Sequence, residues 1–576
     1  MKSFLFDWAF LLLIATNATG QNAAKASSSE ASPDFGPNVL IFDPSMPTSS
    51  IQEAITSVYN AQQKNQFGDR RDALIFKPGS YHVDVGVGFY TEVIGLGSTP
   101  DAVDITGNLH SDAALGNNNG TCNFWRGVTN LSVTPDNGAV KWCVSQATFM
   151  RQVHIKGNLL LHQNNGWVSG GWLANSKVDG FVDSGTQQQW ITRNTEMNSW
   201  KGSNWNMVFV GVSGAPQASF PKPAYTIVEE TPIVKEKPFL MIDQNGNYVV
   251  RVPSLKNNSS SYDWAGGSVP GTTLPISAFY IAKPGVTAST LNSQLSAGKH
   301  LLFTPGIYSI DQTLLVKRAN TIIMGIGLAT LRSQNGVTTM KIEDVDGVMV
   351  SGVLFDAGET KSDTQLEVGT QGKTERNSLN PIVLHDVIFR VGGTVAGKTN
   401  TSVRINANNT IVDHTWVWRA DHGARGTVGW DINTADNGMV VNGNNVTIYG
   451  LFVEHYQKNQ TLWNGNGGRT YMYQSEIPYD VPNQSSWMDG RSNGFASYKV
   501  SNKVKSHEAW GLGIYSYFSA NESNKLSNAI EAPIRPKVKF NNIITICLGQ
   551  RGEITNVINN RGGEVNSGNF ERRLAQ

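Results

Sequence analysis

Two stretches of sequence, Leu74-Ile-Phe-Lys-Pro-Gly-Ser-Tyr81 and Leu301-Leu-Phe-Thr-Pro-Gly-Ile-Tyr308, repeat one another and indicate how the chain folds. A second matching pair follows them, Glu92-Val-Ile-Gly-Leu-Gly97 and Ile322-Ile-Met-Gly-Ile-Gly327. A repeat of this kind has to be settled before any local prediction, because a missed repeat misassigns the whole fold. We conclude that one supersecondary plan is used twice, once in each half of the chain.

The segments around these repeats predict stacked strands. Residues 51–55 and 291–295 precede the two copies and have the apolar spacing of one or two helical turns that would cover an open end of a sheet stack. No long helix separates the strands, so a doubly wound α/β sheet, which needs a crossover helix at each step, is excluded. We predict an all-β chain of two tandem right-handed parallel β-helices. The expected strands include 128–133, 348–355, 382–389, 439–442 and 446–453.

The ends of the chain and its middle differ in composition from the two repeats. Lys2 and the apolar stretch from Trp8 to Ile14, followed by small residues, have the layout of a secretory signal peptide, so we expect a secreted, extracellular protein. The segment between the halves is rich in Pro, Ser and Gly, as connectors are, but contains two predicted strands that would brace the β-helices. The predicted organisation is a signal peptide (1–20), a flexible leader (21–36), an N-terminal β-helix (37–220), a connector (221–275) and a C-terminal β-helix (276–576).

Charge and composition indicate a neutral partner. Lys and Arg total 46 against 45 Asp and Glu, a formal net charge of +1, so no overall field would gather nucleic acid, anionic lipid or a polyuronate. No segment after the leader has the roughly 18 uninterrupted apolar residues of a membrane helix. We therefore expect no contact with nucleic acid or membrane. We also expect the protein to be a monomer.

The cysteines and the glycosylation triplets agree with a secreted, extracellular protein. With only three cysteines, disulfides cannot hold this chain together, although a bridge between Cys122 and Cys143 is plausible, and Cys547 reads as a buried small hydrophobe. Acceptor triplets for N-glycosylation begin at Asn119, Asn130, Asn257, Asn400, Asn408, Asn445, Asn459, Asn483 and Asn521.

The region from 413 to 517 is the densest in carboxylates among aromatic and amide side chains. Glycosidic cleavage needs one carboxylic acid and a second group that activates water or attacks directly. Glu454 and Glu476 are about one coil apart, which would set them side by side on adjacent rungs and raise their affinity for a proton. Either Glu could instead accept a hydrogen bond at a turn.

Aromatic and amide side chains complete the candidate site. Trp463, Tyr479, Trp416 and Trp418 are candidates for sugar stacking, although each Trp could equally lie in the core. The first half offers amides and hydroxyls around residues 145–146, 167–172 and 187–190, which could hold water or sugar hydroxyls or form structural ladders. We expect no metal and no cofactor, since Asp344 and Asp346 come nearest to a calcium cluster and no zinc motif occurs.

Long strings of the chain resemble glycoside hydrolase family 55, the exo-β-1,3-glucanases. The stretches that show the likeness start with Ala73-Leu-Ile-Phe-Lys-Pro-Gly-Ser-Tyr81 and run through 88–97, 187–194, 202–211, 451–458 and 463–471. The resemblance covers residues 37 to about 560. It implies a tandem β-helix with its site between the halves, no metal, and inverting hydrolysis of laminarin-like β-1,3-glucan from the non-reducing end to release glucose.

The same resemblance implies roles for individual residues. Glu476 matches the general acid, Glu454 the carboxylate near the water, and Tyr479 a sugar-contacting aromatic. Ser169, Gln188 and Gln146 match the groups that hold the nucleophilic water, with Gln187 and Gln189 as alternatives to Gln188. Two other functions compete: a β-helix that binds glucan without cleaving it, and a polysaccharide lyase. Glucose release from laminarin separates hydrolase from binding module, while a lyase would give an unsaturated product.

Overall fold

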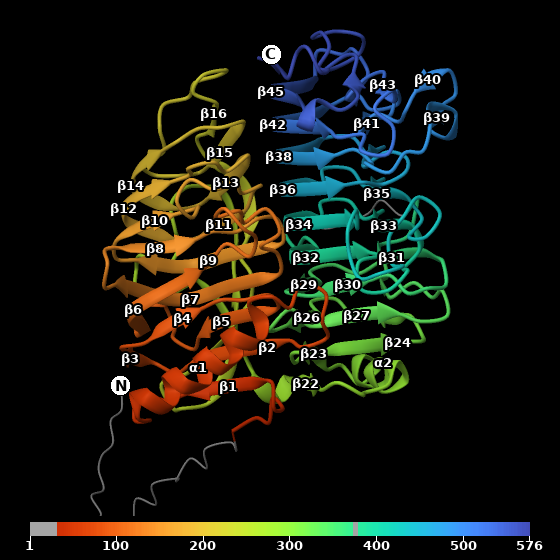
Figure 1. Ribbon diagram of the computed structural model, residues 1–576. Coiled ribbons are helices and arrows are strands. Elements are labelled where there is room, and N and C mark those ends of the chain that lie inside the picture. The colour runs from red at the N-terminus through yellow and green to blue at the C-terminus, as the bar shows by residue number, and fades with distance from the viewer. Residues whose placement is uncertain (1–31, 373–377, 576) are drawn as a thin grey trace, which may run out of the picture.

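The computed structural model describes residues 32–372 and 378–575, and it consists of two parallel β-helices side by side (Figure 1). The predicted fold class is confirmed. The predicted signal peptide, and the leader up to residue 31, lie outside the described residues. Within the described parts of the chain, no helix is long and apolar enough to cross a membrane.

The inner face of the N-terminal β-helix is a parallel ladder in which each strand pairs with the next coil. The fully buried strands Asp72–Phe76 and Thr91–Gly95 are those of the sequence repeat, as expected of strands covered on both faces. The strands in order are β1 (Val39–Phe42), β2 (Asp72–Phe76), β5 (Thr91–Gly95), β7 (Arg126–Pro135), β9 (Thr148–Ile155), β11 (Trp172–Ala174), β13 (Gln189–Arg193), β15 (Asn206–Val210) and β16 (Tyr225–Val228).

The C-terminal β-helix repeats this ladder, and its outer strands form a separate parallel sheet, whereas the outer strands of the N-terminal β-helix are joined to its inner ladder. The inner strands are β22 (Phe279–Ala282), β23 (His300–Phe303), β26 (Ile322–Gly325), β29 (Met349–Ser351), β32 (Val383–Val391), β34 (Ile411–Arg419), β36 (Thr447–Glu454), β38 (Gly468–Glu476), β42 (His507–Ser516) and β45 (Val538–Cys547). The outer strands are β25 (Leu314–Val316), β28 (Met340–Ile342), β31 (Ser362–Val368), β33 (Thr399–Ile405), β35 (Ala435–Val441), β37 (Thr461–Trp463), β41 (Tyr498–Val500) and β44 (Ile530–Glu531).

The internal repeat has the same hydrogen bonds in both halves. The Tyr81 hydroxyl donates to the carbonyls of Phe42 and Lys77, and the Tyr308 hydroxyl donates to those of Ala282 and Thr304. The predicted helical segments also form, as α1 (Thr48–Gln62) and α2 (Ala288–Ser296). Both bury their apolar faces against the first coils, where they cover the ends of the two cores (Figure 1).

The inner sheets of the two β-helices pack on each other through an aromatic core. This shared core includes Trp125 and Trp172 from the first half and Trp416, Trp418 and Phe452 from the second. The segment between the halves forms antiparallel strands, β17 (Thr231–Lys235), β18 (Phe239–Ile242), β19 (Tyr248–Pro253), β20 (Leu255–Ser259) and β21 (Gly271–Pro275). Its apolar side chains join a core with both halves, so it braces them.

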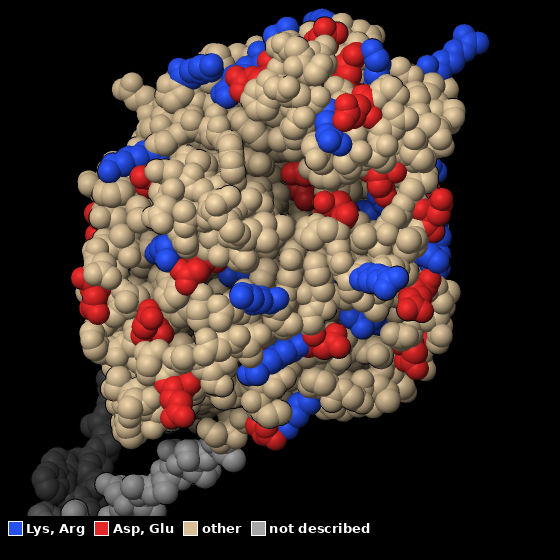
Figure 2. All heavy atoms as spheres, viewed as in Figure 1, with Lys and Arg blue, Asp and Glu red and all other residues tan. Residues whose placement is uncertain are grey.

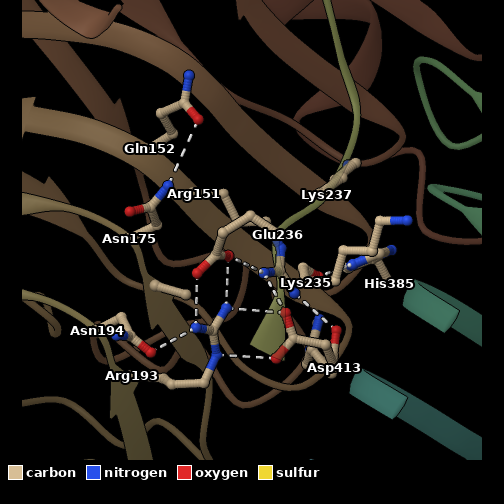
Figure 3. Close-up of polar contacts among 12 residues, drawn as sticks. Arg151, Gln152, Asn175, Arg193, Asn194, Lys235, Glu236, Lys237, His385 and Asp413 are labelled. Atoms are coloured by element: carbon tan, nitrogen blue, oxygen red, sulfur yellow. Dashed lines mark hydrogen bonds and ion pairs between the residues drawn. The ribbon is translucent and has the colours of Figure 1, made fainter. Parts of the chain in front are cut away.

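A buried network of charged side chains also joins the halves (Figure 3). Arg151 on β9 donates to Asp386 on β32 at 2.8 Å and to Asp413 on β34 at 2.7 Å. Arg193 on β13 donates to both oxygens of Asp413 at 2.9 Å, and to both oxygens of Glu236 at 2.8 and 2.7 Å. Three segments distant in the sequence are therefore held at one point by charge-assisted hydrogen bonds.

Three details differ from the sequence expectations. The strand expected over 348–355 is split into β29 and β30 (Leu354–Asp356), because Gly352 between them has a left-handed φ of 66°. Cys122 and Cys143 are free, so the bridge between them is not formed, while Cys547 is buried as expected. The Asn130 side chain is fully buried and donates to the carbonyls of Gly95 and Gly97, which makes that triplet unsuitable for a glycan.

Candidate active site

A pocket of about 270 Å³ opens where the two β-helices meet. Figure 2 shows a hollow between the two halves with acidic side chains in it, on a face where the other charges are scattered. The pocket is lined by Thr121, Cys122, Phe124, Gln146, Ser169, Gln188, Trp416, Trp418, Asp421, His422, Glu454, His455, Glu476, Tyr479 and Leu548.

Glu454 and Glu476 lie at the ends of two neighbouring strands. They are Cα partners in the parallel ladder of β36 and β38, where paired strands run about 4.8 Å apart. Both carboxyls line the pocket. The predicted placement of the two glutamates on adjacent rungs is therefore confirmed, and the coil length alone brings them together.

Glu454 is held by donors from both β-helices. Gln146 Nε2 donates to one of its oxygens at 2.9 Å, and Trp416 Nε1 donates to the other at 2.8 Å. The Ser169 hydroxyl donates in turn to Gln146 Oε1 at 2.9 Å. Gln474 on β38 fixes this loop by donating to the Ser169 carbonyl at 2.5 Å. A chain of polar groups thus runs from Ser169 to the carboxylate.

Gln188 contributes an amide that the protein leaves unused. Within the described residues, its buried Oε1 has no hydrogen-bond partner, so it can accept from a ligand or a water in the pocket. Its neighbours serve the structure instead. Gln187 Nε2 donates to the carbonyls of Val144 and Leu161, and Gln189 Nε2 donates to that of Tyr473. Of the three consecutive glutamines, Gln188 is the one in the pocket.

Glu476 lies beside a tyrosine and a histidine. The Tyr479 hydroxyl donates to Glu476 Oε2, and His455 Nε2 is 3.7 Å from the same oxygen. His455 follows Glu454 and has a left-handed φ of 67°, while its backbone N–H donates to the Glu476 carbonyl at 2.8 Å. This backbone conformation is uncommon for a side chain with a Cβ, and such residues cluster at functional sites.

Burial and mutual repulsion hold a proton on the glutamate pair. Burial raises the pKa of Glu454 well above its ordinary value, and the neighbouring Glu476 raises it further. Burial also raises the pKa of Glu476, opposed by His455 and by the Tyr479 hydrogen bond. Because the two carboxyls interact, they titrate as a pair that retains one proton over a range where isolated glutamates are ionised. Such a pair can supply an acid and a base together.

A second group of charges borders the pocket, at Asp421 and His422. Burial acts to lower the pKa of His422, but Asp421 at 2.9 Å and Cys122 at 3.8 Å together outweigh it, and the pKa rises to about 10. Burial would raise the pKa of Asp421, but His455 and His422 hold it below its ordinary range. Asp421 and His422 thus favour each other's charged form, and His422 Nε2 also lies 2.8 Å from Gln66 Nε2.

The aromatic candidates divide between site and core. Trp416 and Trp418 border the pocket but are each only 1% exposed, because they stack in the shared aromatic core with ring centroids 4.7 Å apart and planes at 19°. Tyr479 also lines the pocket. Trp463 was predicted to contact substrate, and this prediction is wrong. Its side chain is fully buried in the core of the C-terminal β-helix, 4.7 Å from the His507 ring. It belongs to outer strand β37 and points into the core of its own β-helix, and it is not among the residues that line the pocket.

Sequence reasoning did not single out Asp421, His422, His455, Thr121 or Cys122. Asp421, His422 and His455 lie in the region 413–517, which is rich in acidic and aromatic residues. Their position in the same region as Glu454 was the sequence feature that could have identified them. Thr121 and Cys122 lie in a loop of the first half with no such signal. In the described chain, no three His, Cys, Asp or Glu side chains are grouped as metal ligands would be.

Known proteins with similar sequences and structures include β-1,3-glucanases. A family profile described as the LAM55 pectate lyase-like domain matches residues 279–476. An exo-beta-1,3-glucanase from Streptomyces sp. (strain SirexAA-E / ActE) is 46% identical over 560 residues, which cover 96% of this chain and 92% of that protein.

Solved structures agree with the sequence comparison. The structure of sacteLam55A from Streptomyces sp. SirexAA-E has a TM-score of 0.92 and 46% identity, over 94% of this chain and 98% of that one. A glutamate-to-alanine variant of sacteLam55A in complex with glucose matches with the same TM-score and identity. With a pocket built from both β-helices and a likeness that extends over nearly its whole length, the chain belongs to glycoside hydrolase family 55.

Proposed function

We propose that the protein is an exo-β-1,3-glucanase that removes glucose from the non-reducing end of laminarin-like β-1,3-glucan with inversion of configuration. The pairing of Glu454 with Glu476 at one end of a pocket that both β-helices build supports glycosidic hydrolysis most directly, while the inverting course is inferred from the likeness to family 55. The volume of the pocket, about 270 Å³, is just below the ~300–1,000 Å³ of pockets for drug-sized ligands. It suits the end of a chain better than its middle.

In the proposed reaction, the proton that the pair shares is on Glu476, while the hydrogen bonds from Gln146 and Trp416 favour ionised Glu454. Glu476 donates this proton to the glycosidic oxygen as the bond from that oxygen to C1 breaks. A water held by Ser169, Gln146 and Gln188 attacks C1 from the opposite face, and Glu454 accepts its proton. The products are glucose and a glucan shorter by one unit, and proton exchange with solvent restores the pair. The proton count balances, since one is given and one is taken.

The charges around the pocket suit this reaction. The transition state resembles an oxocarbenium ion, so positive charge develops on the sugar ring. The negative charge shared by the glutamate pair lies in the same pocket and would stabilise that charge, while the charge of Asp421 is taken up by its contact with His422. Trp416 and Trp418 lie behind the pocket in the shared aromatic core, and Trp416 acts on the site through its hydrogen bond to Glu454.

We further propose that the protein is secreted and acts as a monomer. The layout of residues 1–20 supports secretion. The pocket is completed by a single chain, which supports a monomeric enzyme, because both walls come from its own β-helices. Detection of the protein in culture medium and its mass in solution test these two proposals.

Incubation of the purified protein with laminarin tests the main proposal. Glucose should accumulate from the first time points without a ladder of oligosaccharides, and laminarihexaose labelled at its reducing end should keep its label while it shortens. Binding of laminarin without glucose release would favour a glucan-binding module. An unsaturated product absorbing in the ultraviolet would favour a lyase.

A further inference from the structure

Cys122 carries a free thiol in the pocket, and the proposed reaction does not use it. It lies in the loop before β7, is partly buried and lines the pocket. The other two cysteines do not reach the pocket. Cys143 and Cys547 are both buried, and burial raises the pKa of the Cys143 thiol to about 11 and that of Cys547 above its ordinary value. Of the three thiols, the one at Cys122 is open to a reagent.

A histidine and a carboxylate lie next to this thiol. Cys122 Sγ is 3.8 Å from His422 Nε2, and His422 Nδ1 is 2.9 Å from Asp421 Oδ1. His422 follows β34 of the C-terminal β-helix, so the thiol and its imidazole come from different halves of the molecule. An imidazole that a carboxylate holds in this way assists deprotonation of a neighbouring thiol and stabilises the thiolate, which is the nucleophilic form of cysteine.

The His422 ring is also held from other sides. Gln66 Nε2 is 2.8 Å from His422 Nε2, so the glutamine amide shares this nitrogen with the thiol. The rings of Phe67 and Trp418 meet the imidazole edge to face, with centroids 5.6 and 5.3 Å away. The imidazole is therefore a fixed neighbour of the thiol, as a group that assists a reaction has to be.

The pocket beside the thiol can take a small polar molecule. Gln188 is only 9% exposed, and among the described residues its buried Oε1 has no hydrogen-bond partner. It lines the same pocket, so a hydroxyl-bearing reagent can donate to this oxygen. With a volume of about 270 Å³, the pocket has little room for a group on Cys122 and a sugar ring together. A group attached to the thiol should therefore exclude the substrate.

We propose that Cys122 is a thiol-modification site, at which a low-molecular-weight disulfide forms a mixed disulfide that closes the pocket. The Cys122 thiolate attacks one sulfur of the reagent, the new S–S bond forms as the old one breaks, and the thiol proton ends on the released thiol. The reagent disulfide is reduced, so no other oxidant is needed. Cys122 takes no part in glucan cleavage, and only the effect on activity rests on the proposed function.

Hydroxyethyl disulfide, added in excess to the folded protein, tests the site by mass spectrometry. One hydroxyethylthio group should attach, and peptide mapping should place it on Cys122, whereas the unfolded protein should take up three. Cys122→Ser should take up none in the folded state. His422→Gln should form the adduct about tenfold more slowly, because the thiol loses its imidazole partner. His82→Gln is the matched control. It removes a histidine beside Asp136, 71% exposed on the N-terminal β-helix, and should leave the rate unchanged.

Glucose release from laminarihexaose is measured on the same samples. It should fall in proportion to the adduct and return when dithiothreitol removes the group, and glucose added beforehand should slow the modification. Equal reaction of the buried thiols, a His422→Gln protein that reacts as fast as the unmodified one, or full activity of the adduct would overturn the proposal. If the unmodified protein released no glucose, the proposed function would fail instead, and the mass measurement would still decide whether Cys122 is the reactive thiol.

Discussion

Replacing Asp413 by asparagine tests how the two β-helices are held together. Asp413 has a fully buried side chain and accepts hydrogen bonds from Arg193 at 2.9 Å and from Arg151 at 2.7 Å. The substitution keeps the shape of the side chain but leaves two buried guanidinium groups short of a charge partner. Removing one member of a buried ion pair costs about 3–5 kcal/mol, because the remaining charge has lost its compensation.

The pKa values in the network indicate the same dependence. Burial acts to lower the pKa of Arg193, but Asp413 and Glu236 raise it above its ordinary value. Burial acts to raise the pKa of Glu236, but Arg193 lowers it to about 2. Each charged group is thus stabilised by its partners and not by solvent (Figure 3). Loss of the Asp413 charge therefore destabilises charged groups in both β-helices.

Asp363→Asn provides a matched control in the same β-helix. Asp363 pairs with Arg404 at 2.7 Å, but its side chain is 60% exposed, so its loss should cost under about 1 kcal/mol. The free energy of unfolding is obtained from urea titrations followed by tryptophan fluorescence. If Asp413→Asn lowered it by no more than Asp363→Asn, the idea that this buried network joins the halves would be refuted.

Four further outcomes follow from the site. Proton NMR of the first product should show α-glucose before mutarotation, as inversion requires, and β-glucose would exclude that mechanism. Trp416→Phe removes a hydrogen-bond donor to ionised Glu454, so the pKa of Glu454 should rise and the acidic limb of the pH profile of kcat should move to higher pH. The value of kcat should fall about tenfold to a hundredfold. An acidic limb that does not move would show that Trp416 does not stabilise the base. Because burial raises the pKa of Glu454 above its ordinary 4.5, the folded state loses stability as pH rises from 4.5 through that raised pKa. Glu454→Gln removes this loss, so it should raise the melting temperature more at pH 7 than at pH 4. An equal rise in melting temperature at both pH values would contradict the raised pKa. Alkylation of the unfolded, unreduced protein should add three groups by mass spectrometry, whereas a single group would indicate a bridge.

The fold and the two glutamates could be predicted from the sequence because both depend on a period. Coils of similar length place residues one coil apart on adjacent strands, so the spacing of Glu454 and Glu476 was sufficient to predict their pairing. The repeated Pro-Gly turns and the tyrosines Tyr81 and Tyr308 likewise follow from the repeat. These features depend on short stretches of sequence or on the length of a coil, so they can be read from the sequence without knowing how the two β-helices pack.

Features that depend on the contact between the two β-helices could not be predicted in this way. Trp416 and Trp463 are the same residue type in similar strands, but one lies on the inner sheet facing the partner helix and the other points into its own core. His455 reaches the pocket through a left-handed backbone angle that no spacing rule indicates. The packing of the halves, and not the strand pattern, decides which side chains surround the glutamates.

Hydrolysis of laminarihexaose by Glu476→Gln is the most direct test of the central claim, that two paired glutamates catalyse cleavage in this pocket. Loss of a general acid should reduce kcat/KM by about 10²–10⁴-fold. Glu531→Gln, which removes a carboxylate paired with Lys499 at 3.1 Å on the outer face, should leave it unchanged. A Glu476→Gln protein that releases glucose as fast as the unmodified enzyme would contradict the account.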